Sequence, residues 1–154
     1  MPLLDSQDVS IIITTYNRKR ELVFTLNTLR EVIADDGIYI WDDASTDHTF
    51  EYISSEYPEI NIFQNTVNKG LIANRNQLMQ AAPTEYVLSL DDDAHFLNRV
   101  ALEKSMSFMQ ENFNCAVLSF RLFWGLQKPA NQKTTEKTYQ VGNFLGGAHL
   151  MRKS

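Results

Sequence analysis

Residues 86–93 read YVLSLDDD, an apolar run that ends directly on three aspartates. A run this rich in Val and Leu is typical of a buried strand. Three adjacent carboxylates at its end are costly, because two of them about 5 Å apart repel by roughly 3 kcal/mol at an effective dielectric of 20. A divalent cation held by oxygen ligands is the usual agent that offsets such repulsion. The stretch therefore predicts a strand that delivers acidic ligands to the edge of a sheet.

The three aspartates are not expected to be equivalent. Side chains alternate along an extended segment, so Asp91 and Asp93 are expected on one side and Asp92 on the other. A D-x-D pair on one side can share a metal ion whose remaining coordination positions are open to a phosphate. The alternative is a solvated acidic turn or a cap for the next helix. Because a cap needs only one aspartate, we favour metal and phosphate binding.

Outward from this strand, strand-like and helix-like segments alternate along the chain. The expected strands cover 9–14, 38–41, 60–63, 86–90 and 115–123, and the expected helices cover 18–34, 47–57, 71–82 and 97–112. Polar residues dominate 127–137 without any period, which predicts a surface loop. The alternation predicts an α/β fold with a mostly parallel sheet and helices on both of its faces.

Composition limits the classes of partner. The 154 residues are 44% hydrophobic and 21% charged, as in an ordinary globular protein, and predict one domain over 1–154. A net charge of −5 argues against nucleic acid as a partner. The single cysteine, Cys115, lies in an apolar run and is expected to be a small core residue. Without an apolar stretch of about 18 residues or a basic leader, the expected location is the cytoplasm.

The end of the first strand carries a polar cluster, TTYNR at 14–18. In open parallel sheets, ligands gather beyond the carboxyl ends of the strands. Tyr16 offers an aromatic face for a base, and Thr14 offers main-chain groups beside its hydroxyl. Asn17 is expected to be a helix N-cap. Arg18 would follow in the first helical turn, where the dipole does not favour a cation, and this conflict hints at a phosphate partner.

Two further clusters follow the next strands. Asp43 could accept a hydrogen bond from the imide N–H of a pyrimidine. A capped turn is the alternative, and it would explain Ser45, Thr46 and Asp47 but not the pair Asp42 and Asp43. Gly70 is expected to open a helix that carries Arg75, a fork-shaped donor suited to phosphates or to orienting carboxylates. An arginine alone is as often a surface charge. The three histidines share no spacing that would indicate a histidine metal site.

Read in order, these motifs resemble family 2 glycosyltransferases of the GT-A fold. The resemblance is carried by VSIIITTYNR at 9–18, IWDDASTDHT at 40–49, NKGLIANRN at 68–76 and LSLDDD at 88–93. The segment FLGGAHLMRK at 144–153 is similar to the Gly-rich segment that lies on the acceptor side in that family.

The resemblance implies a nucleotide-sugar donor, most often UDP-linked, bound together with Mn²⁺ or Mg²⁺. By matching position, Thr14 and Tyr16 would contact the base and Asp43 its imide. Asp93 would be the main metal ligand, with Asp91 beside it. The residues expected to bind the donor all lie at strand ends, near a helix start or in the Gly-rich segment: Thr14, Tyr16, Asn17, Arg18, Asp43, Arg75, Asp91, Asp92, Gly146 and Gly147.

The implied reaction is an inverting transfer, in which an acceptor hydroxyl attacks the anomeric carbon as the nucleoside diphosphate leaves. The family's general base is an acidic residue beyond the Gly-rich segment, so it is expected beyond Ser154. The chain is therefore expected to be a truncated donor-binding half. The acceptor could be a polysaccharide, a lipid-linked saccharide or a protein. A lipid-linked acceptor could bring the enzyme to the inner membrane face.

Two alternatives remain open from the sequence. A nucleotidyltransferase would also use a metal ion at a strand end, but it would want a glycine-rich phosphate loop that 14–20 lacks. A nucleotide-sugar-binding module without catalysis would fit the missing general base. Nucleotide preference separates the first alternative from glycosyl transfer.

Overall fold

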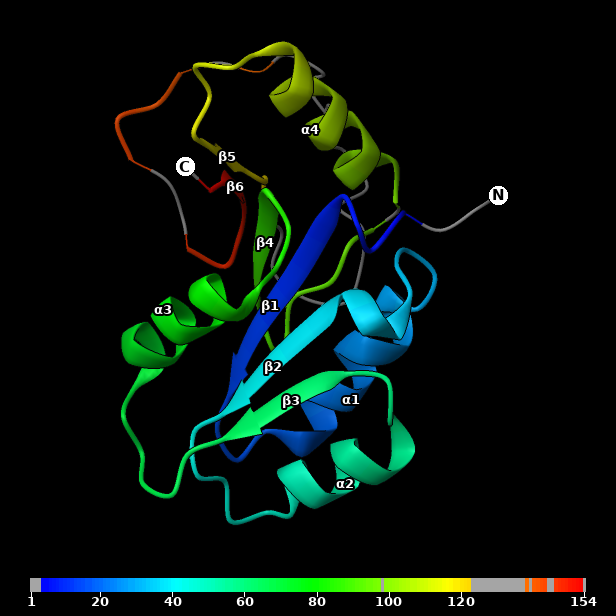
Figure 1. The fold of residues 1–154 in the computed structure, drawn as a ribbon, viewed down its shortest axis with the longest axis vertical. Coiled ribbons are helices and arrows are strands. Elements are labelled where there is room, and N and C mark those ends of the chain that lie inside the picture. The colour runs from blue at the N-terminus through cyan, green and yellow to red at the C-terminus, as the bar shows by residue number, and fades with distance from the viewer. Residues whose placement is uncertain (1–3, 98, 123–137, 139, 144–145, 154) are drawn as a thin grey trace.

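The computed structural model describes residues 4–97, 99–122, 138, 140–143 and 146–153 (Figure 1). The strands are β1 (Val9–Thr15), β2 (Ile38–Asp42), β3 (Asn61–Gln64), β4 (Tyr86–Asp91), β5 (Val117–Ser119) and β6 (Ala148–Arg152). The helices are α1 (Lys19–Leu29), α2 (Thr49–Glu56), α3 (Leu71–Ala81) and α4 (Val100–Glu111), with the short 3₁₀ helix η1 (Asp35–Gly37) before β2. The expected loop at 127–137 lies outside the described residues.

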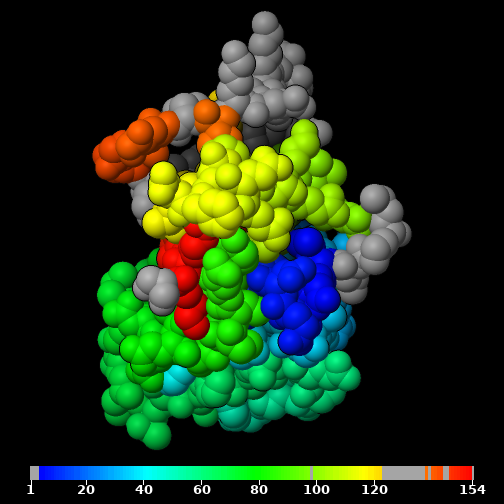
Figure 2. Space-filling view, turned by 45° about the horizontal axis from the view of Figure 1, so that its top comes forward, coloured from blue at the N-terminus to red at the C-terminus, as the bar shows by residue number. Residues whose placement is uncertain are grey.

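The strands form one sheet in the order β3-β2-β1-β4-β6-β5. The strands β3, β2, β1 and β4 are parallel, whereas β6 pairs antiparallel with both β4 and β5. The predicted mostly parallel α/β sheet is confirmed. In the space-filling view, the red segment of β6 lies directly beside the green segment of β4 (Figure 2). Residues about sixty positions apart in the chain therefore meet at this join.

The core explains why β1 consists almost entirely of β-branched residues. Every residue of β1 is buried, because helices cover both faces of the sheet. Ile11 and Ile13 pack in the larger core with apolar residues of α1, α2 and α4. Ile12 points to the opposite face and packs in a smaller core against Leu78 of α3. The expectation of helices on both faces is thus confirmed.

The observed boundaries differ from the predicted ones at two helices and one strand. Helix α1 ends at Leu29 rather than at residue 34, because Val32 accepts a hydrogen bond from the backbone of Leu4 and Ile33 forms a bridge with it. Helix α4 begins at Val100 rather than at residue 97. The strand expected at 115–123 is limited to β5. Cys115 was expected to be a small core residue; it is half-buried and packs against the larger core rather than within it.

Candidate functional site

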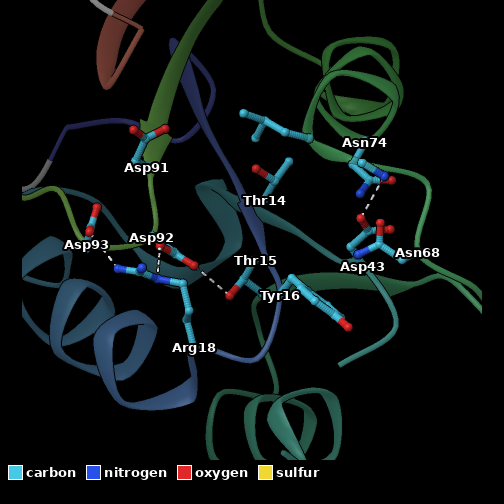
Figure 3. A pocket seen from close by; sticks show the side chains of 12 residues that line it. Thr14, Thr15, Tyr16, Arg18, Asp43, Asn68, Asn74, Asp91, Asp92 and Asp93 are labelled. Atoms are coloured by element: carbon cyan, nitrogen blue, oxygen red, sulfur yellow. Dashed lines mark hydrogen bonds and ion pairs between the residues drawn. The ribbon is translucent and has the colours of Figure 1, made fainter. Parts of the chain in front are cut away.

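A cleft of about 410 Å³ lies at the carboxyl ends of β1, β2 and β4 (Figure 3). It brings together residues from all four of the clusters that the sequence indicated. Its lining consists of Thr14, Thr15, Tyr16, Arg18, Asp43, Asn68, Gly70, Leu71, Asn74, Asp91, Asp92 and Asp93. Figure 3 shows Thr14 between Asp91 on one side of the cleft and Asp43 on the other. The cleft therefore has two acidic ends.

The three aspartates at one end of the cleft differ in their partners. Asp91 is the last residue of β4, and its Oδ1 accepts a hydrogen bond from Nη2 of Arg75 at 3.0 Å. Asp92 and Asp93 both contact Arg18, with Nε–Oδ1 at 2.9 Å and Nη2–Oδ2 at 2.6 Å. The prediction that Asp92 faces away from Asp93 is therefore wrong. Strand alternation stops at Asp91, where the chain turns and the N–H of Ala94 donates to the Asp91 carbonyl at 3.1 Å.

Asp92 is the most buried of the three aspartates. Burial raises its pKa to about 6, even though the Thr15 hydroxyl and the Arg18 guanidinium act in the opposite direction. Burial likewise raises the pKa of Asp91, against the opposing effect of Arg75. Desolvation thus outweighs the ion pairs at both carboxylates. Three carboxylates against two guanidinium groups leave an excess of negative charge, which favours a further cation.

Asp43 at the other end of the cleft has a different environment. Its Oδ1 accepts hydrogen bonds from Nδ2 of Asn65 at 2.7 Å and the N–H of Lys69 at 2.8 Å, and its Oδ2 accepts from the N–H of Gly70 at 2.8 Å. Burial alone would raise the pKa of Asp43, but the amides of Asn74 and Asn65 and the two backbone N–H groups together lower it. Asp43 is therefore held as a carboxylate without an arginine.

The adjacent Asp42 has a structural role. It is fully buried, and its Oδ1 accepts from the N–H of Ser45 at 3.0 Å while its Oδ2 accepts from Nε2 of Gln64 at 3.2 Å. This turn contact accounts for Asp42, which the alternative of a capped turn had left unexplained, whereas Asp43 lines the cleft. Asp47 also has a capping contact, because its Oδ1 accepts from the N–H of Thr49 at the start of α2 at 3.2 Å.

The end of β1 supplies the floor of the cleft. Thr14 is buried there, whereas Tyr16 is 47% exposed and keeps a ring face available. Asn17 is not the N-cap of α1, so that prediction is wrong. It has a left-handed backbone with φ of 54°, and its Oδ1 accepts from the N–H of Thr46 at 2.7 Å. Asn17 is not among the residues that line the cleft, and it ties two loops beside it.

The Gly-rich segment borders the aspartates through backbone contacts. The N–H of Asp91 donates to the carbonyl of Gly147 at 3.0 Å. A Cβ at Gly147 would lie 2.9 Å from Cδ1 of Leu122 and 3.3 Å from Oδ2 of Asp91, so a side chain there would collide with its neighbours. A Cβ at Gly146 would lie 4.0 Å from Nη1 of Arg75. The structure thus brings both glycines beside the Arg75–Asp91 pair.

Four polar residues with roles in this region were missed by sequence reasoning. Thr15 and Thr25 contact Asp92, and Asn65 and Asn74 surround Asp43. Thr25 and Asn74 are fully buried on helices whose other buried residues are mostly apolar. A polar residue on the apolar stripe of a predicted helix is the signal that could have found these two. Asn65 lies between β3 and α3, where nothing in the sequence distinguishes it.

The sequence pattern of the family described as Glycosyl transferase family 2 matches residues 10–151. The chain belongs to glycosyltransferase family 2. An uncharacterized glycosyltransferase of Haemophilus influenzae is 29% identical over 153 residues, which span 93% of this chain and 51% of the relative. A putative glycosyltransferase of Bacillus subtilis, EpsE, is 32% identical over 110 residues, which span 68% of this chain and 39% of the relative. The chain thus spans about half or less of the length of these relatives.

Solved structures with low sequence identity share the fold of this glycosyltransferase family 2 chain. The mannosyltransferase PcManGT from Pyrobaculum calidifontis, in complex with GDP-Man and Mn²⁺, matches 99% of this chain and 48% of its own, with a TM-score of 0.71 and 19% identity. S. aureus TarS 1-349 in complex with UDP matches 94% of this chain and 46% of its own, with a TM-score of 0.71 and 22% identity. These likenesses confirm the predicted GT-A fold.

The described residues contain neither a metal cage built from protein side chains nor a membrane-spanning helix. Within them, no group of three or more His, Cys, Asp or Glu side chains is arranged to hold a metal ion. Nor does any helix in the same part of the chain have the length and apolar character that a membrane span requires. A metal ion at the aspartates would therefore need ligands from another source.

Proposed function

We propose that this chain binds a nucleotide-sugar donor, namely a UDP-sugar together with Mn²⁺ or Mg²⁺, and forms the donor-binding part of an inverting glycosyltransferase. The observation that carries the proposal is one cleft with a hydrogen-bonded carboxylate, Asp43, at one end and three crowded carboxylates at the other. A nucleoside diphosphate has the matching chemistry, with N–H donors on its base and an anionic diphosphate that needs a cation. Family membership supports the same proposal.

The choice of uracil rests on the acceptor positions left at Asp43. A carboxylate has about four lone-pair sites, and Oδ1 already receives two donors while Oδ2 receives at least one. The Asn74 amide also donates to Asp43, so a base can only share an acceptor position with one of these donors. Uracil presents a single imide N–H between two carbonyl groups, whereas guanine presents two adjacent donors that need two acceptors. Tyr16 would contribute its exposed ring face, on which a base can stack.

The aspartates suit a divalent cation that is coordinated partly by carboxylates and partly by the phosphates of the nucleotide. Asp93 has a side chain that is 55% exposed, and the side chain of Asp91 is 42% exposed, so both can offer oxygen ligands toward the cleft. Mg²⁺ is usually held by one or two carboxylates together with substrate phosphates rather than by an all-protein cage. This preference agrees with the lack of a three-residue cage among the described residues.

In the proposed chemistry, the cation and the residues of the chain have different roles. When bound, the cation would stabilise the charge that develops on the leaving diphosphate. Arg75 would hold Asp91 in place, and Asp92 would support the turn or contact the ribose. Gly146 and Gly147 would leave room for the sugar beside Asp91. We propose that the general base that accepts the proton of the acceptor hydroxyl lies beyond Ser154 in the full protein, as in the family.

The acceptor and the location of the full protein are also matters of proposal. A saccharide, a lipid-linked saccharide or a protein could each supply the acceptor hydroxyl. We propose a cytoplasmic protein, and a lipid-linked acceptor would bring it to the inner membrane face. Nucleic acid is not a proposed partner, because the net charge of −5 would repel it.

Calorimetric titration tests the proposal. The chain would be titrated with UDP, with GDP and with UTP, each in the presence of Mn²⁺ and in the presence of EDTA. We expect UDP to bind at least about 100-fold more tightly with Mn²⁺ than without it, a difference of about 2.8 kcal/mol. We also expect UDP to bind more tightly than GDP. A preference for UTP over UDP would instead favour a nucleotidyltransferase, and metal-independent binding would contradict the proposed cation.

A further inference from the structure

Thr25 is a fully buried polar residue on the core-facing side of α1. The same buried face carries Leu22, Leu26 and Leu29, so an apolar residue would be expected at this position. Threonine is also a weaker helix former than the straight-chain residues. A buried hydroxyl is costly unless it forms a hydrogen bond. The buried Thr25 hydroxyl therefore needs a hydrogen-bond acceptor, and the structure contains one.

That partner is the backbone of the acidic turn. The Thr25 hydroxyl donates to the main-chain carbonyl of Asp92 at 2.9 Å, across 67 positions of sequence. The Asp92 carbonyl lies just beyond the end of β4, where the regular strand pairing with its neighbours has stopped. A side-chain donor from α1 thus takes the place of a strand partner there. Phe24 reinforces the contact, because its ring meets His95 edge-on at a centroid distance of 5.3 Å.

Asp92 is consequently held at three separate atoms. Its carbonyl oxygen accepts from Thr25, its Oδ2 accepts from the Thr15 hydroxyl at 2.9 Å, and its Oδ1 contacts Nε of Arg18 at 2.9 Å. With the carboxylate of Asp92 engaged on both oxygens, the side chain points inward. The next residue, Asp93, is more than half exposed beside the cleft. Together with the contact of Asp93 Oδ2 with Nη2 of Arg18 at 2.6 Å, the orientation of the peptide that joins Asp92 to Asp93 sets where the second carboxylate points.

We propose that Thr25 is a positioning residue for the metal site: its hydroxyl fixes the Asp92 carbonyl and thereby directs the Asp93 carboxylate toward the cleft. This inference rests on the proposed function, because it assigns a purpose to the orientation of Asp93. Thr25 touches neither the donor nor the cation. Its effect is expected on the cation-dependent part of nucleotide binding alone, since the Asp43 end of the cleft lies on other elements.

The test compares Thr25→Val with the wild-type chain. Valine keeps the shape of threonine but removes the donor, so the Asp92 carbonyl is left unsatisfied and the turn is expected to reorient. Loss of such outer contacts typically weakens metal binding about 10-fold to 100-fold. We expect the ratio of UDP affinities with and without Mn²⁺ to fall at least about tenfold. UDP binding in EDTA should stay unchanged.

Two further variants separate positioning from general stability. Thr25→Ser restores the hydroxyl and should recover most of the Mn²⁺ effect. Thr84→Val is a matched control at the opposite end of β4, because the buried Thr84 hydroxyl donates to the carbonyl of Tyr86 at 2.6 Å. It should lower thermal stability without changing the ratio. If Thr25→Val does not fold, Thr25→Ala removes the same hydroxyl with a better helix former.

The possible results are distinct. The inference is overturned if the Thr25 variants keep the wild-type Mn²⁺ effect, if UDP binding in EDTA falls equally, or if Thr84→Val lowers the ratio as much. The inference is also overturned if Thr25→Ser fails to restore the effect. A wild-type chain without any Mn²⁺ effect would overturn the proposed function, and the role of Thr25 with it. Electron paramagnetic resonance of Mn²⁺ without nucleotide provides an independent measure of cation binding.

Discussion

The two acidic ends of the cleft stabilise negative charge in opposite ways. At the Asp43 end, one carboxylate is surrounded by N–H groups of the backbone and of asparagine side chains, and its pKa is lowered. At the end formed by Asp91, Asp92 and Asp93, the partners are two arginines, and burial raises the pKa of Asp91 and Asp92. Carboxylates thus occupy both ends, but neutral N–H donors hold the one at Asp43, whereas arginines face the three at the other end.

The difference shows what each end can recognise. Neutral N–H donors hold Asp43 in a fixed position without cancelling its charge, so a neutral donor of the ligand can share one of its acceptor positions. The three aspartates cannot all be neutralised by Arg18 and Arg75, so they favour a divalent cation over a neutral ligand. A ligand that spans the cleft should therefore be neutral and donating at one end and dependent on a cation at the other.

The largest expected effect comes from Asp93→Asn, which should alter only the cation-dependent end. Replacing a direct metal ligand should lower the affinity for UDP in Mn²⁺ by about 100-fold. Binding in EDTA should stay as in the wild-type chain, because Asp43 is untouched. Calorimetry under both conditions measures the two affinities. An equal loss under both conditions would mean that the two ends do not act separately.

A smaller loss is expected from Asp43→Asn at the opposite end. The amide would present an N–H to the donors that now face Asp43, and hydrogen bonds to charged groups contribute about 1.5–3 kcal/mol. We therefore expect UDP to bind at least about tenfold more weakly, both with and without Mn²⁺. Asp42→Asn is an informative companion, because Asp42 is buried next to it but does not line the cleft. Retained UDP affinity in Asp43→Asn would refute the base-binding role.

A more modest change is expected from Gly147→Ala, which adds a methyl group beside Asp91 and Leu122. Overpacking of this kind costs about 1–3 kcal/mol. The displaced Asp91 carboxylate should weaken Mn²⁺-dependent binding by about fivefold, equivalent to roughly 1 kcal/mol. Gly142→Ala is the matched control, because a Cβ there would meet nothing within 4 Å. If Gly147→Ala and Gly142→Ala show the same Mn²⁺-dependent UDP affinity, the close packing at Gly147 does not affect cation-dependent binding.

The smallest expected effect concerns pH and stability at the Asp43 end. Because the pKa of Asp43 is lowered in the folded chain, its ionised form stabilises the fold above its unfolded pKa of about 4. That contribution is lost as the pH falls through the folded pKa. The difference in unfolding free energy between wild type and Asp43→Asn should therefore shrink in acid. Denaturant unfolding at pH 7 and at lower pH measures it, and a constant difference would contradict the assignment.

Sequence patterns were sufficient for the parallel half of the molecule. The run of β-branched residues in β1 and the helical spacing of leucines in α1 report directly on burial, which explains why these elements were predicted at nearly the right place. The end of α1 was missed because it depends on a bridge to Leu4, which is a tertiary contact. The extent of β5 was missed because pairing with β6 limits it to three residues.

The residues that form the candidate site could be predicted from the sequence, but the contacts among them could not. The aspartates, Tyr16 and Asp43 were found because they follow apolar strands, and strand ends meet in a parallel sheet. The pairing of Arg18 with Asp92 and Asp93 could not be predicted, because it depends on the turn that begins after Asp91. Asn17 was assigned to a cap because its preference for helix starts is strong, but its left-handed backbone aims the side chain at Thr46 instead.

The position of β6 between β4 and β5 also affects how the chain is made. The acidic turn gains its contact with Gly147 only after the last strand has left the ribosome and inserted. Until then, β4 presents an unpaired apolar edge, a template for unwanted association of nascent chains. We expect amide exchange at Val87 and Ser89, whose N–H groups face β6, to slow only once Arg152 has left the ribosome. Protection of these amides in a shorter nascent chain would show that the edge is covered earlier.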